Sequence, residues 1–371
     1  MAAGLRSERA EFEVTRSAFG TFFMGFSDRI LGRKNVNGGP HIESVAPACA
    51  LTGGEIRILG SGLRPPELQR PKVKFGEFEG PIVISSDGFL VTRVPEGATS
   101  GPVVVATDGS VSNAQTVNVA VPIAENLHPV TNPAVDAEGN IYVTFSGSRG
   151  QKVPVAIFKI DTNYTVKPFV SEMMNPTSIA FDREGQMYVS SRFDGAVYRV
   201  SPAGNVSTFS EGLGVATGIA FDREQSLYVG DRNGTIFKIS RDQQTFVFAT
   251  LELSVSAYHL AFGPHGDLFV TGPNDRIYKV DPNGTVTTFY KGLGRPQGLA
   301  FDADGNLHVA ASLAGTRGIV KVTPDAKASL EVAGQGLVGL AFAPGRSVIL
   351  ATSNAVHHLS WNIAGFPLVP E

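Results

Sequence analysis

Three side chains of this sequence carry chemistry that a cation-dependent enzyme could use. They are the carboxylate of Asp231, the imidazole of His259 and the carboxamide of Asn132. Ca²⁺ and Mg²⁺ prefer oxygen ligands, so Asp231 and Asn132 are the candidate metal ligands. An imidazole near a bound cation could act as a general base, which makes His259 and Asp231 the candidate catalytic residues.

Two arginines offer a different chemistry. Arg192 and Arg232 occur in the similar phrases SSRFDG and GDRNG. Guanidinium groups on neighbouring loops could clamp a carboxylate or a phosphate. The alternative, which the sequence favours, is that each arginine pairs with a nearby carboxylate such as Asp194 or Asp231. Tyr258 and Gln297 complete the candidate ligand-binding residues, because each replaces a smaller residue at its place in a repeat.

The repeat itself recurs six times at intervals of roughly 40 residues, a period typical of β-propellers. Each copy reads as an apolar strand, a tight turn and a second strand, as in SIAFDREGQMYVSS from Ser178. The turns often follow the pattern Asp-x-x-Gly, in which Asp caps the turn and Gly closes it. One apolar position is shared by all six copies: Val135, Phe181, Phe221, Phe262, Phe301 and Phe342. The sequence therefore predicts six four-stranded blades in a closed ring.

This ring determines where the candidate residues lie. The inner strand of a blade begins, and its second strand ends, on the same face of the ring. Asn132 and His259 precede or begin inner strands, whereas Asp231 and the two arginines follow second strands. We expect all of them around one mouth of the central channel. The ring also needs a closing strand, which could come from Ile363–Glu371 or from Val117–Ile123.

The repeats resemble NHL repeats and the wider group of six-bladed propellers that includes gluconolactonase-like and virginiamycin lyase-like proteins. The resemblance implies a cation held by the Asn of a Pro-Asn-Gly phrase and the Asp of a Tyr-Val-Ala-Asp phrase. Here no repeat has Asn in that slot, and RPQGLAF carries Gln297 instead. Asp231 is the sole carboxylate of the second column, whereas a hard cation usually takes several. The lyase-like members imply a His and a cation, for which His259 is the candidate. We therefore predict no resident cofactor, with Ca²⁺ or Mg²⁺ left open.

Residues 40–121 show a separate pattern of short alternating strands and Gly-rich turns, which predicts a small β-sandwich. The segments PHIESVAP from Pro40, GGEIRILGSGL from Gly53 and VPEGATSGPVVV from Val94 resemble an immunoglobulin-like IPT/TIG domain. Such domains serve as spacers or interaction modules. We expect an N-terminal arm over residues 1–39, with a short helix as one alternative, this sandwich over 40–121, and the propeller over 122–371.

Composition and charge argue against a nucleic-acid-binding protein and against a protein with a membrane-spanning helix. The chain has 371 residues, a net charge of −3 and one cysteine. It carries no general attraction for nucleic acid, and no apolar run is long enough for a membrane helix. The apolar stretch from Ser17 to Phe26 lacks a signal-peptide cleavage site, so a cytoplasmic location is favoured without being fixed.

We therefore expect an all-β binding or scaffold protein, not an enzyme, whose propeller channel face recognises a small molecule, a glycan or a protein. The alternative is a cation-dependent lactone hydrolase or lyase of the gluconolactonase-like or virginiamycin lyase-like kind. In that case a cation would polarise a carbonyl with water or His259 as the base.

Overall fold

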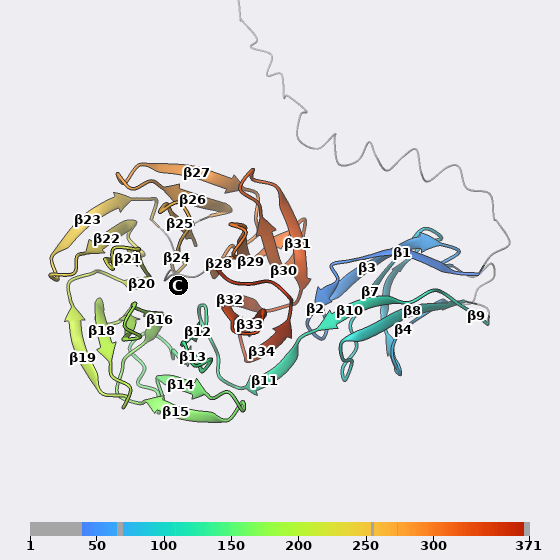
Figure 1. The fold of residues 1–371 in the computed structure, drawn as a ribbon, viewed down its shortest axis with the longest axis horizontal. Coiled ribbons are helices and arrows are strands. Elements are labelled where there is room, and N and C mark those ends of the chain that lie inside the picture. The colour runs from blue at the N-terminus through green and yellow to red at the C-terminus, as the bar shows by residue number, and fades with distance from the viewer. Residues whose placement is uncertain (1–38, 65–69, 108, 254–255, 273, 367–371) are drawn as a thin grey trace, which may run out of the picture.

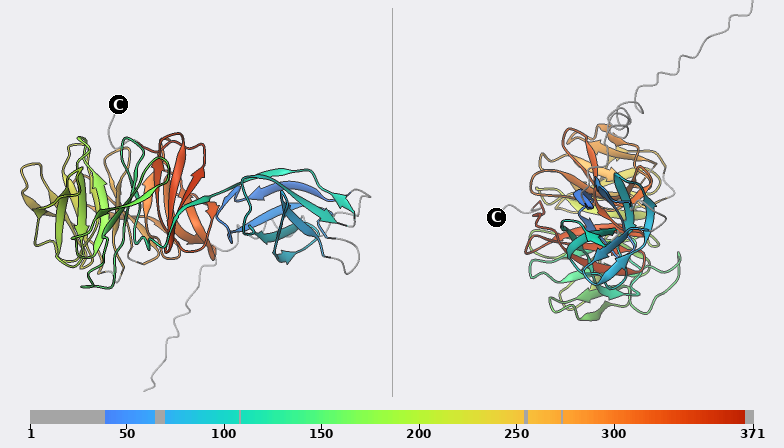
Figure 2. Two further views of the ribbon diagram at one scale, coloured as in Figure 1. Left: turned by 90° about the horizontal axis from the view of Figure 1, so that it is seen from below. Right: turned by 90° about the vertical axis from the view of Figure 1, so that its right-hand side faces the viewer.

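The computed structural model describes residues 39–366, except 65–69, 108, 254–255 and 273. The predicted N-terminal arm thus lies outside the described residues apart from Gly39. The described chain is all-β, and it contains no helix that could cross a membrane. Six four-stranded blades surround a central channel, and a smaller β module projects from one side of the ring (Figures 1 and 2).

Five blades are each built from four consecutive antiparallel strands. The first contains β12 (Ala134–Val135), β13 (Ile141–Thr144), β14 (Ile157–Ile160) and β15 (Val166–Val170). The second contains β16 (Pro176–Phe181), β17 (Met187–Ser191), β18 (Ala196–Val200) and β19 (Val206–Ser210). The third contains β20 (Ala216–Phe221), β21 (Leu227–Asp231), β22 (Thr235–Ile239) and β23 (Thr245–Thr250). The fourth contains β24 (His259–Phe262), β25 (Leu268–Thr271), β26 (Arg276–Val280) and β27 (Val286–Lys291). The fifth contains β28 (Leu299–Phe301), β29 (Leu307–Leu313), β30 (Thr316–Val322) and β31 (Ala328–Ala333).

The sixth blade is closed by a strand from far upstream. Its strands β32 (Leu337–Ala343), β33 (Ser347–Thr352) and β34 (Ala355–Ser360) are joined on the outside by β11 (Val121–Glu125). Val121 pairs with His358 and Glu125 with Ala355 in an antiparallel register. Of the two segments that the sequence offered for closure, the upstream one overlaps this strand at Val121–Ile123, whereas its first residues belong to β10 (Gln115–Val119) of the N-terminal module. The described part of the other, up to Phe366, instead bonds to the turn of the fifth blade through Ala364 and Phe366.

Aromatic rings hold neighbouring blades together in a repeated contact. In the third blade, Tyr228 on the second strand meets Phe248 of its own outer strand and Phe262 of the next inner strand. Both contacts are edge-to-face with ring centroids 4.9 Å apart. The same arrangement is centred on Tyr142, Tyr188 and Phe269. In the fifth blade, His308 contacts Phe342 of the next inner strand and Trp361, which follows β34. The shared Phe positions of the repeat are therefore the contacts between blades, as expected for buried aromatic pairs.

The N-terminal module contains two sheets over one core. One sheet has the order β1 (His41–Ala46), β3 (Glu55–Ser61), β7 (Phe89–Arg93) and β6 (Ile82–Ser85). The other contains β2 (Cys49–Ala50), β10 (Gln115–Val119), β8 (Gly101–Thr107), β4 (Lys72–Phe75) and β5 (Phe78–Gly80), with β9 (Ser110–Val111) beside β8. Side chains from both sheets, such as Ile56 and Val105, are fully buried in this core. The immunoglobulin-like assignment stays a prediction.

The second sheet continues into the propeller. Strand β2 pairs in parallel with both β10 and β31, which places Cys49 opposite Val332 and Ala50 opposite Ala333. One sheet of ten strands thus runs from the fifth blade into the N-terminal module. Cys49 is buried at this junction, and burial raises the pKa of its thiol to about 11. Backbone hydrogen bonds cross this junction, so the two parts share a sheet. The expected domain boundary near residue 121 stays a proposal.

The contacts between blades predict a large cost for removing one ring. Phe262→Ala should lower the free energy of unfolding by about 3–5 kcal/mol, because the cavity lies between two rigid sheets. Phe246→Ala removes the same ring from a side chain that is 51% exposed, and it should change that free energy by less than about 0.5 kcal/mol. Urea denaturation of both variants tests the contrast, and equal losses would contradict it.

Candidate functional site

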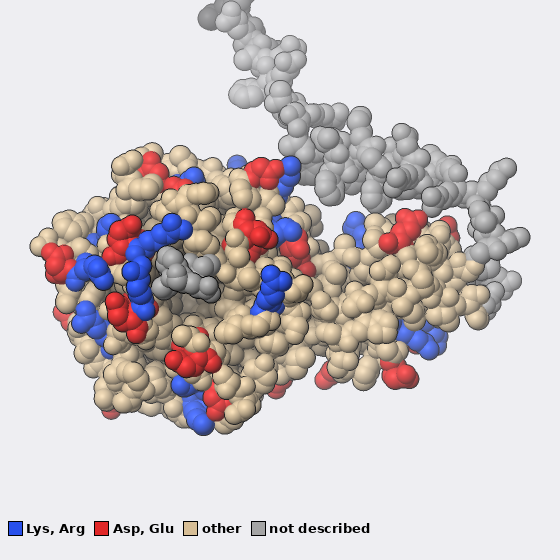
Figure 3. Space-filling model, viewed as in Figure 1, with Lys and Arg blue, Asp and Glu red and all other residues tan. Residues whose placement is uncertain are grey.

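The ring has two distinct faces. On the loop side lie the loops that follow second strands and precede inner strands, where the sequence places every candidate residue. On the turn side lie the tight hairpin turns between first and second strands, and this is the side that faces the viewer in Figure 3. Among the described residues, the polar side chains on the loop side mostly bond to the backbone, whereas several on the turn side line a cleft.

A column of hydroxyls on the loop side ties the blades together. Thr131 donates to the carbonyl oxygen of Thr177 at 2.6 Å, across the boundary between the first two blades. Ser190 donates to the carbonyl of Thr217, and Thr271 donates to that of Gln297. All three donors are buried. These hydroxyls satisfy backbone groups between blades and are not directed at a ligand.

Asn132 precedes the inner strand of the first blade, and its side chain bridges the fifth and sixth blades. Its Nδ2 donates to the carbonyl of Leu299 at 2.9 Å, and its Oδ1 accepts from the N–H of Leu340 at 3.1 Å. A Cβ at Gly298 or Gly339 would collide with Asn132, so these glycines make room for its side chain. The amide oxygen proposed as a metal ligand is thus engaged by the sixth blade.

His259 occupies the equivalent position in the fourth blade and is also buried, with 5% of its surface exposed. Burial lowers the pKa of its imidazole to about 4. The side chain is therefore neutral near pH 7, and a general base with so low a pKa holds a proton weakly. A Cβ at Gly218 would collide with the backbone of Tyr258 and His259, so the third and fourth inner strands approach closely here.

Asp231 caps a loop of its own blade. Its Oδ1 accepts from the N–H of Val215 at 2.7 Å and from Nδ2 of Asn233 at 3.2 Å. The residue is only 4% exposed. Its carboxylate therefore serves the local backbone, in the way that Asp commonly stabilises turns.

Tyr258 and Gln297 are similarly engaged. The hydroxyl of Tyr258 donates to the carbonyl of Glu252, and burial raises the pKa of this phenol to about 12. Gln297 accepts a hydrogen bond from the guanidinium of Arg317. Arg317 also binds the carbonyls of Arg295 and Leu337. Burial, reinforced by the charge of Arg295, lowers the pKa of Arg317 to about 10. This guanidinium joins the fifth and sixth blades.

Arg192 and Arg232 lie near enough for the charge of Arg232 to lower the pKa of Arg192, and among the described residues Arg192 forms no ion pair with Asp194. Arg192 donates from Nη2 to the carbonyl of Gly147 at 2.8 Å. Asp194 instead accepts from Ser191 and from Tyr198, and Asp231 caps the Val215 loop. Among the described residues, no cluster of three or more His, Cys, Asp or Glu side chains could hold a metal.

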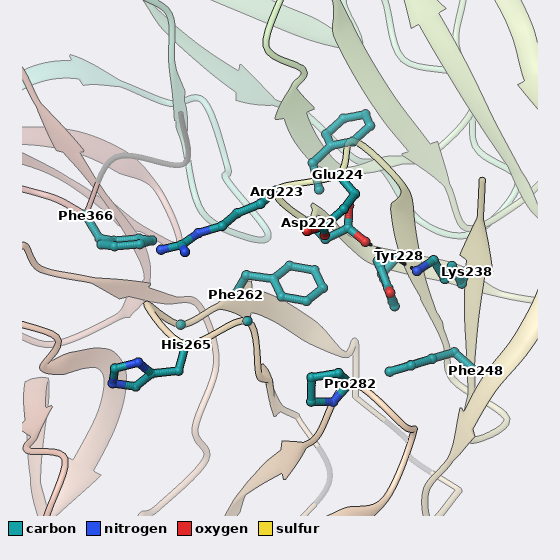
Figure 4. Close-up of a pocket in the computed structure, with 13 residues that line it drawn as sticks. Asp222, Arg223, Glu224, Tyr228, Lys238, Phe248, Phe262, His265, Pro282 and Phe366 are labelled. Carbon is teal, nitrogen blue, oxygen red and sulfur yellow. Dashed lines mark ion pairs between the residues drawn. The ribbon is translucent and has the colours of Figure 1, made fainter. Parts of the chain in front are cut away.

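A cleft on the turn side lies between the third and fourth blades and was not anticipated from the sequence (Figure 4). It has a volume of about 340 Å³. Phe248, Phe262 and Phe366 contribute aromatic surface, and the polar groups of Asp222, Lys238 and Glu224 lie around the same space. Figure 3 shows side chains of both charges around this mouth of the channel.

The polar floor of the cleft is a compact group. Lys238 Nζ lies 3.5 Å from Oδ2 of Asp222 and 5.2 Å from the ring centroid of Tyr228. Burial by itself lowers the pKa of Lys238, but contact with Tyr228 and Asp222 outweighs it and the net shift is upward. The pKa of the Tyr228 phenol is also raised, in this case by burial itself. Lys238 is thus charged and Tyr228 protonated near neutral pH, so both can donate hydrogen bonds.

The rim of the cleft is shaped by residues outside the common repeat pattern. The guanidinium of Arg223 lies 5.7 Å from the ring centroid of Phe366 and donates to the carbonyl of Pro264 at 2.8 Å. Glu224 and His265 are exposed beside it. One feature of the sequence could have pointed to this cleft: in the turn Asp222–Gln225, Gln replaces the Gly that ends the common Asp-x-x-Gly pattern. Gln225 adopts a φ of 66° and accepts a hydrogen bond from the N–H of Arg183.

No protein-family model matches the chain, and no curated protein matches it in sequence. Solved structures do share its fold. A Bacteroides thetaiotaomicron protein of unknown function has a TM-score of 0.55 at 15% identity, covering 88% of this chain and 99% of its own. An auxiliary nutrient binding protein from Bacteroides ovatus has a TM-score of 0.53 at 13% identity, covering 91% and 100%. A Xanthomonas campestris gluconolactonase has a TM-score of 0.55 at 14% identity, covering 64% and 88%.

At these identities the likeness shows the fold alone. It places the chain among all-β proteins with a propeller fold. The first two structures cover more of this chain than its propeller contains, so the likeness extends into the N-terminal module. The NHL-repeat and IPT/TIG assignments stay predictions.

The burial of His259 predicts a pH-dependent stability. Its pKa rises from about 4 in the folded chain to about 6.5 on unfolding, so the unfolded state binds the proton more tightly. The stabilisation is fully present above pH 6.5 and is lost as the pH falls through 4, by about 3 kcal/mol in all. His259→Gln should flatten this part of the stability–pH curve. Burial also lowers the pKa values of His357 and His358, which leave a residual slope. Urea denaturation from pH 4 to 7 is the measurement, and an unchanged slope would contradict the assignment.

Proposed function

We propose that this protein is a non-enzymatic recognition protein that binds a small, neutral, ring-shaped polar molecule, such as a sugar, in the turn-side cleft. The observation that carries the proposal is the combination of aromatic surface with hydrogen-bonding groups of both kinds in one cleft of about 340 Å³. That volume lies in the range of small-molecule sites.

The aromatic side chains suit the apolar faces of a sugar ring. Phe262 is fixed by its contact with Tyr228, and Phe366 is fixed by Arg223 and by the bond from its N–H to the carbonyl of Phe301. Rings held in place before binding lose little conformational freedom when a ligand arrives, which favours affinity.

The polar groups that line the cleft suit a ligand with hydroxyl groups better than a ligand with a net charge. Asp222 and Lys238 compensate each other. Glu224 supplies an acceptor, and Tyr228 and Lys238 supply donors. A hydroxyl both donates and accepts, so a polyol can satisfy this mixed set. A strongly anionic or cationic ligand would meet the opposite sign on one side and its own sign on the other.

The comparisons agree with this proposal without deciding it. A protein named for nutrient binding has a fold that matches this chain over most of its length. The name says nothing of this chain's own ligand, because a shared propeller supports many functions.

The cation-dependent lactonase or lyase remains the alternative. Its proposed ligands Asp231 and Asn132 would have to give up hydrogen bonds to Val215 and Leu340 to bind a cation. We therefore favour recognition at the cleft over catalysis at the loop-side mouth.

Saturation-transfer NMR with glucose, galactose, mannose and their disaccharides tests the proposal. We expect at least one of these sugars to bind, and Glu224→Gln and Phe366→Ala to weaken that binding by roughly tenfold. Glu138→Gln is the matched control, because Glu138 holds the same place in the turn of the first blade, away from the cleft. If no sugar binds, or if Glu138→Gln weakens binding as much as Glu224→Gln does, the proposal is wrong.

A further inference from the structure

We propose that Arg149, Arg192 and Arg232 on the loop side form a second site, which binds an oxyanion, either a carboxylate or a phosphate group. The three arginines come from loops that follow the second strands of three consecutive blades: β13–β14, β17–β18 and β21–β22. This site lies on the face of the ring opposite the cleft and does not depend on the function proposed for it.

The central guanidinium is fixed by the loop of the preceding blade. Arg192 donates from Nη2 to the carbonyl of Gly147, and Gly147 lies two residues before Arg149. The carbonyl of Gly147 also accepts from Nδ2 of Asn175 at 3.0 Å. The loop that carries Arg149 and the side chain of Arg192 are thus joined at one backbone oxygen.

Asn175 holds this arrangement in place. Its Nδ2 also donates to the carbonyl of Ser148 at 2.9 Å, and its Oδ1 accepts from the N–H of Gly150 at 2.6 Å. Its carbonyl accepts from the N–H of Arg192. The residue is fully buried and has a φ of 40°, in the left-handed region that non-glycine residues seldom adopt. Such backbone strain often accompanies a functional site, where the surrounding contacts maintain it.

The third arginine is positioned by an equivalent backbone contact. The N–H of Arg232 donates to the carbonyl of Val215, just as the N–H of Arg192 donates to that of Asn175. The charges of Arg232 and Arg149 act on Arg192, whose pKa is lowered by burial first and then by these two neighbours. Like charges are therefore held near one another in a partly buried place, which is unfavourable without an anion.

Nearby carboxylates of the described chain do not neutralise Arg149 or Arg192. Asp194 is bonded to Ser191 and Tyr198, and Asp231 caps the Val215 loop. Among the described residues, no carboxylate forms an ion pair with Arg149 or Arg192. Nε of Arg192 is buried and has no hydrogen-bond partner there, whereas buried donors in proteins are nearly always satisfied.

An oxyanion would meet each of these requirements. It would offset the repulsion between guanidinium groups and accept the planar N–H donors that suit carboxylate and phosphate oxygens. Phe193, 46% exposed, lies against Gly150 at the same place, so an organic anion could also rest an apolar part on this ring.

Calorimetric titration of the full-length protein with inorganic phosphate and, separately, with benzoate tests the proposal at constant ionic strength, with chloride as the reference salt. We expect at least one of the two to bind, and the binding to weaken as salt is added. Phosphate alone would identify the phosphate class, and benzoate alone the carboxylate class. Binding of neither anion would overturn the proposal.

Variants separate this site from general charge effects. Arg192→Gln should weaken the binding roughly 10- to 100-fold. Arg149→Gln, at an exposed residue, should also weaken it and guards against a folding defect in the first variant. Arg241→Gln removes the same charge from the turn side, and Glu224→Gln alters the cleft; both should bind the anion as the unaltered protein does. Equal weakening in Arg241→Gln and Arg192→Gln would refute the site.

Discussion

The pairing of β11 with β34 is the constraint on which the rest of the structure depends. It closes the ring and covers the outer edge of β34, so that the short strand β11 is the outer edge of the sixth blade. Strand β10 belongs to the core of the N-terminal module, and β11 begins two residues after β10 ends. The strand that closes the propeller is therefore a direct continuation of the chain from that module. The parallel pairing of β2 with β31 makes a second connection between the same two parts. The module is therefore part of the architecture of the ring, although most of its core is its own.

Closure makes the inter-blade aromatic contacts mutually dependent. Each central ring, such as Tyr228, lies between its own blade and the next, so a shift of one blade is transmitted to its neighbour. The fifth blade varies this scheme: His308 takes the aromatic place, and its Nε2 lies 2.8 Å from a carboxylate oxygen of Asp302. Both proposed sites are built where loops or turns of neighbouring blades meet, and each needs the blades in a fixed arrangement. In that same arrangement, Asn132 forms hydrogen bonds with backbone groups of the fifth and sixth blades, and His259 is buried.

Features that recur in every repeat could be predicted from the sequence, whereas features formed by residues outside the repeat pattern could not. The column of Phe residues was predictable, because a fixed period assigns equivalent positions to equivalent places in each blade. The cleft was not, because Phe366 lies beyond the last repeat and contacts Arg223 of the third blade. Arg149 was missed because its loop between β13 and β14 is much longer than the equivalent loops β17–β18 and β21–β22, so the repeat assigns no matching position to it. The pairing of Cys49 and Ala50 with β31 rests on a two-residue strand, too short to carry a periodic signal. The predicted roles of Asp231 and Asn132 came from resemblance, and the local hydrogen bonds of these side chains could not be read from composition or spacing.

We infer that ring closure through β11 makes the propeller and the N-terminal module one cooperative unit. Hydrogen exchange at rising urea concentration tests this inference by comparing the amides of β34 with those of β3. We expect the same opening free energy for both strands, since neither part should lose its structure while the other keeps its own. Amides of β34 that stay protected at urea concentrations where β3 has already opened would contradict it.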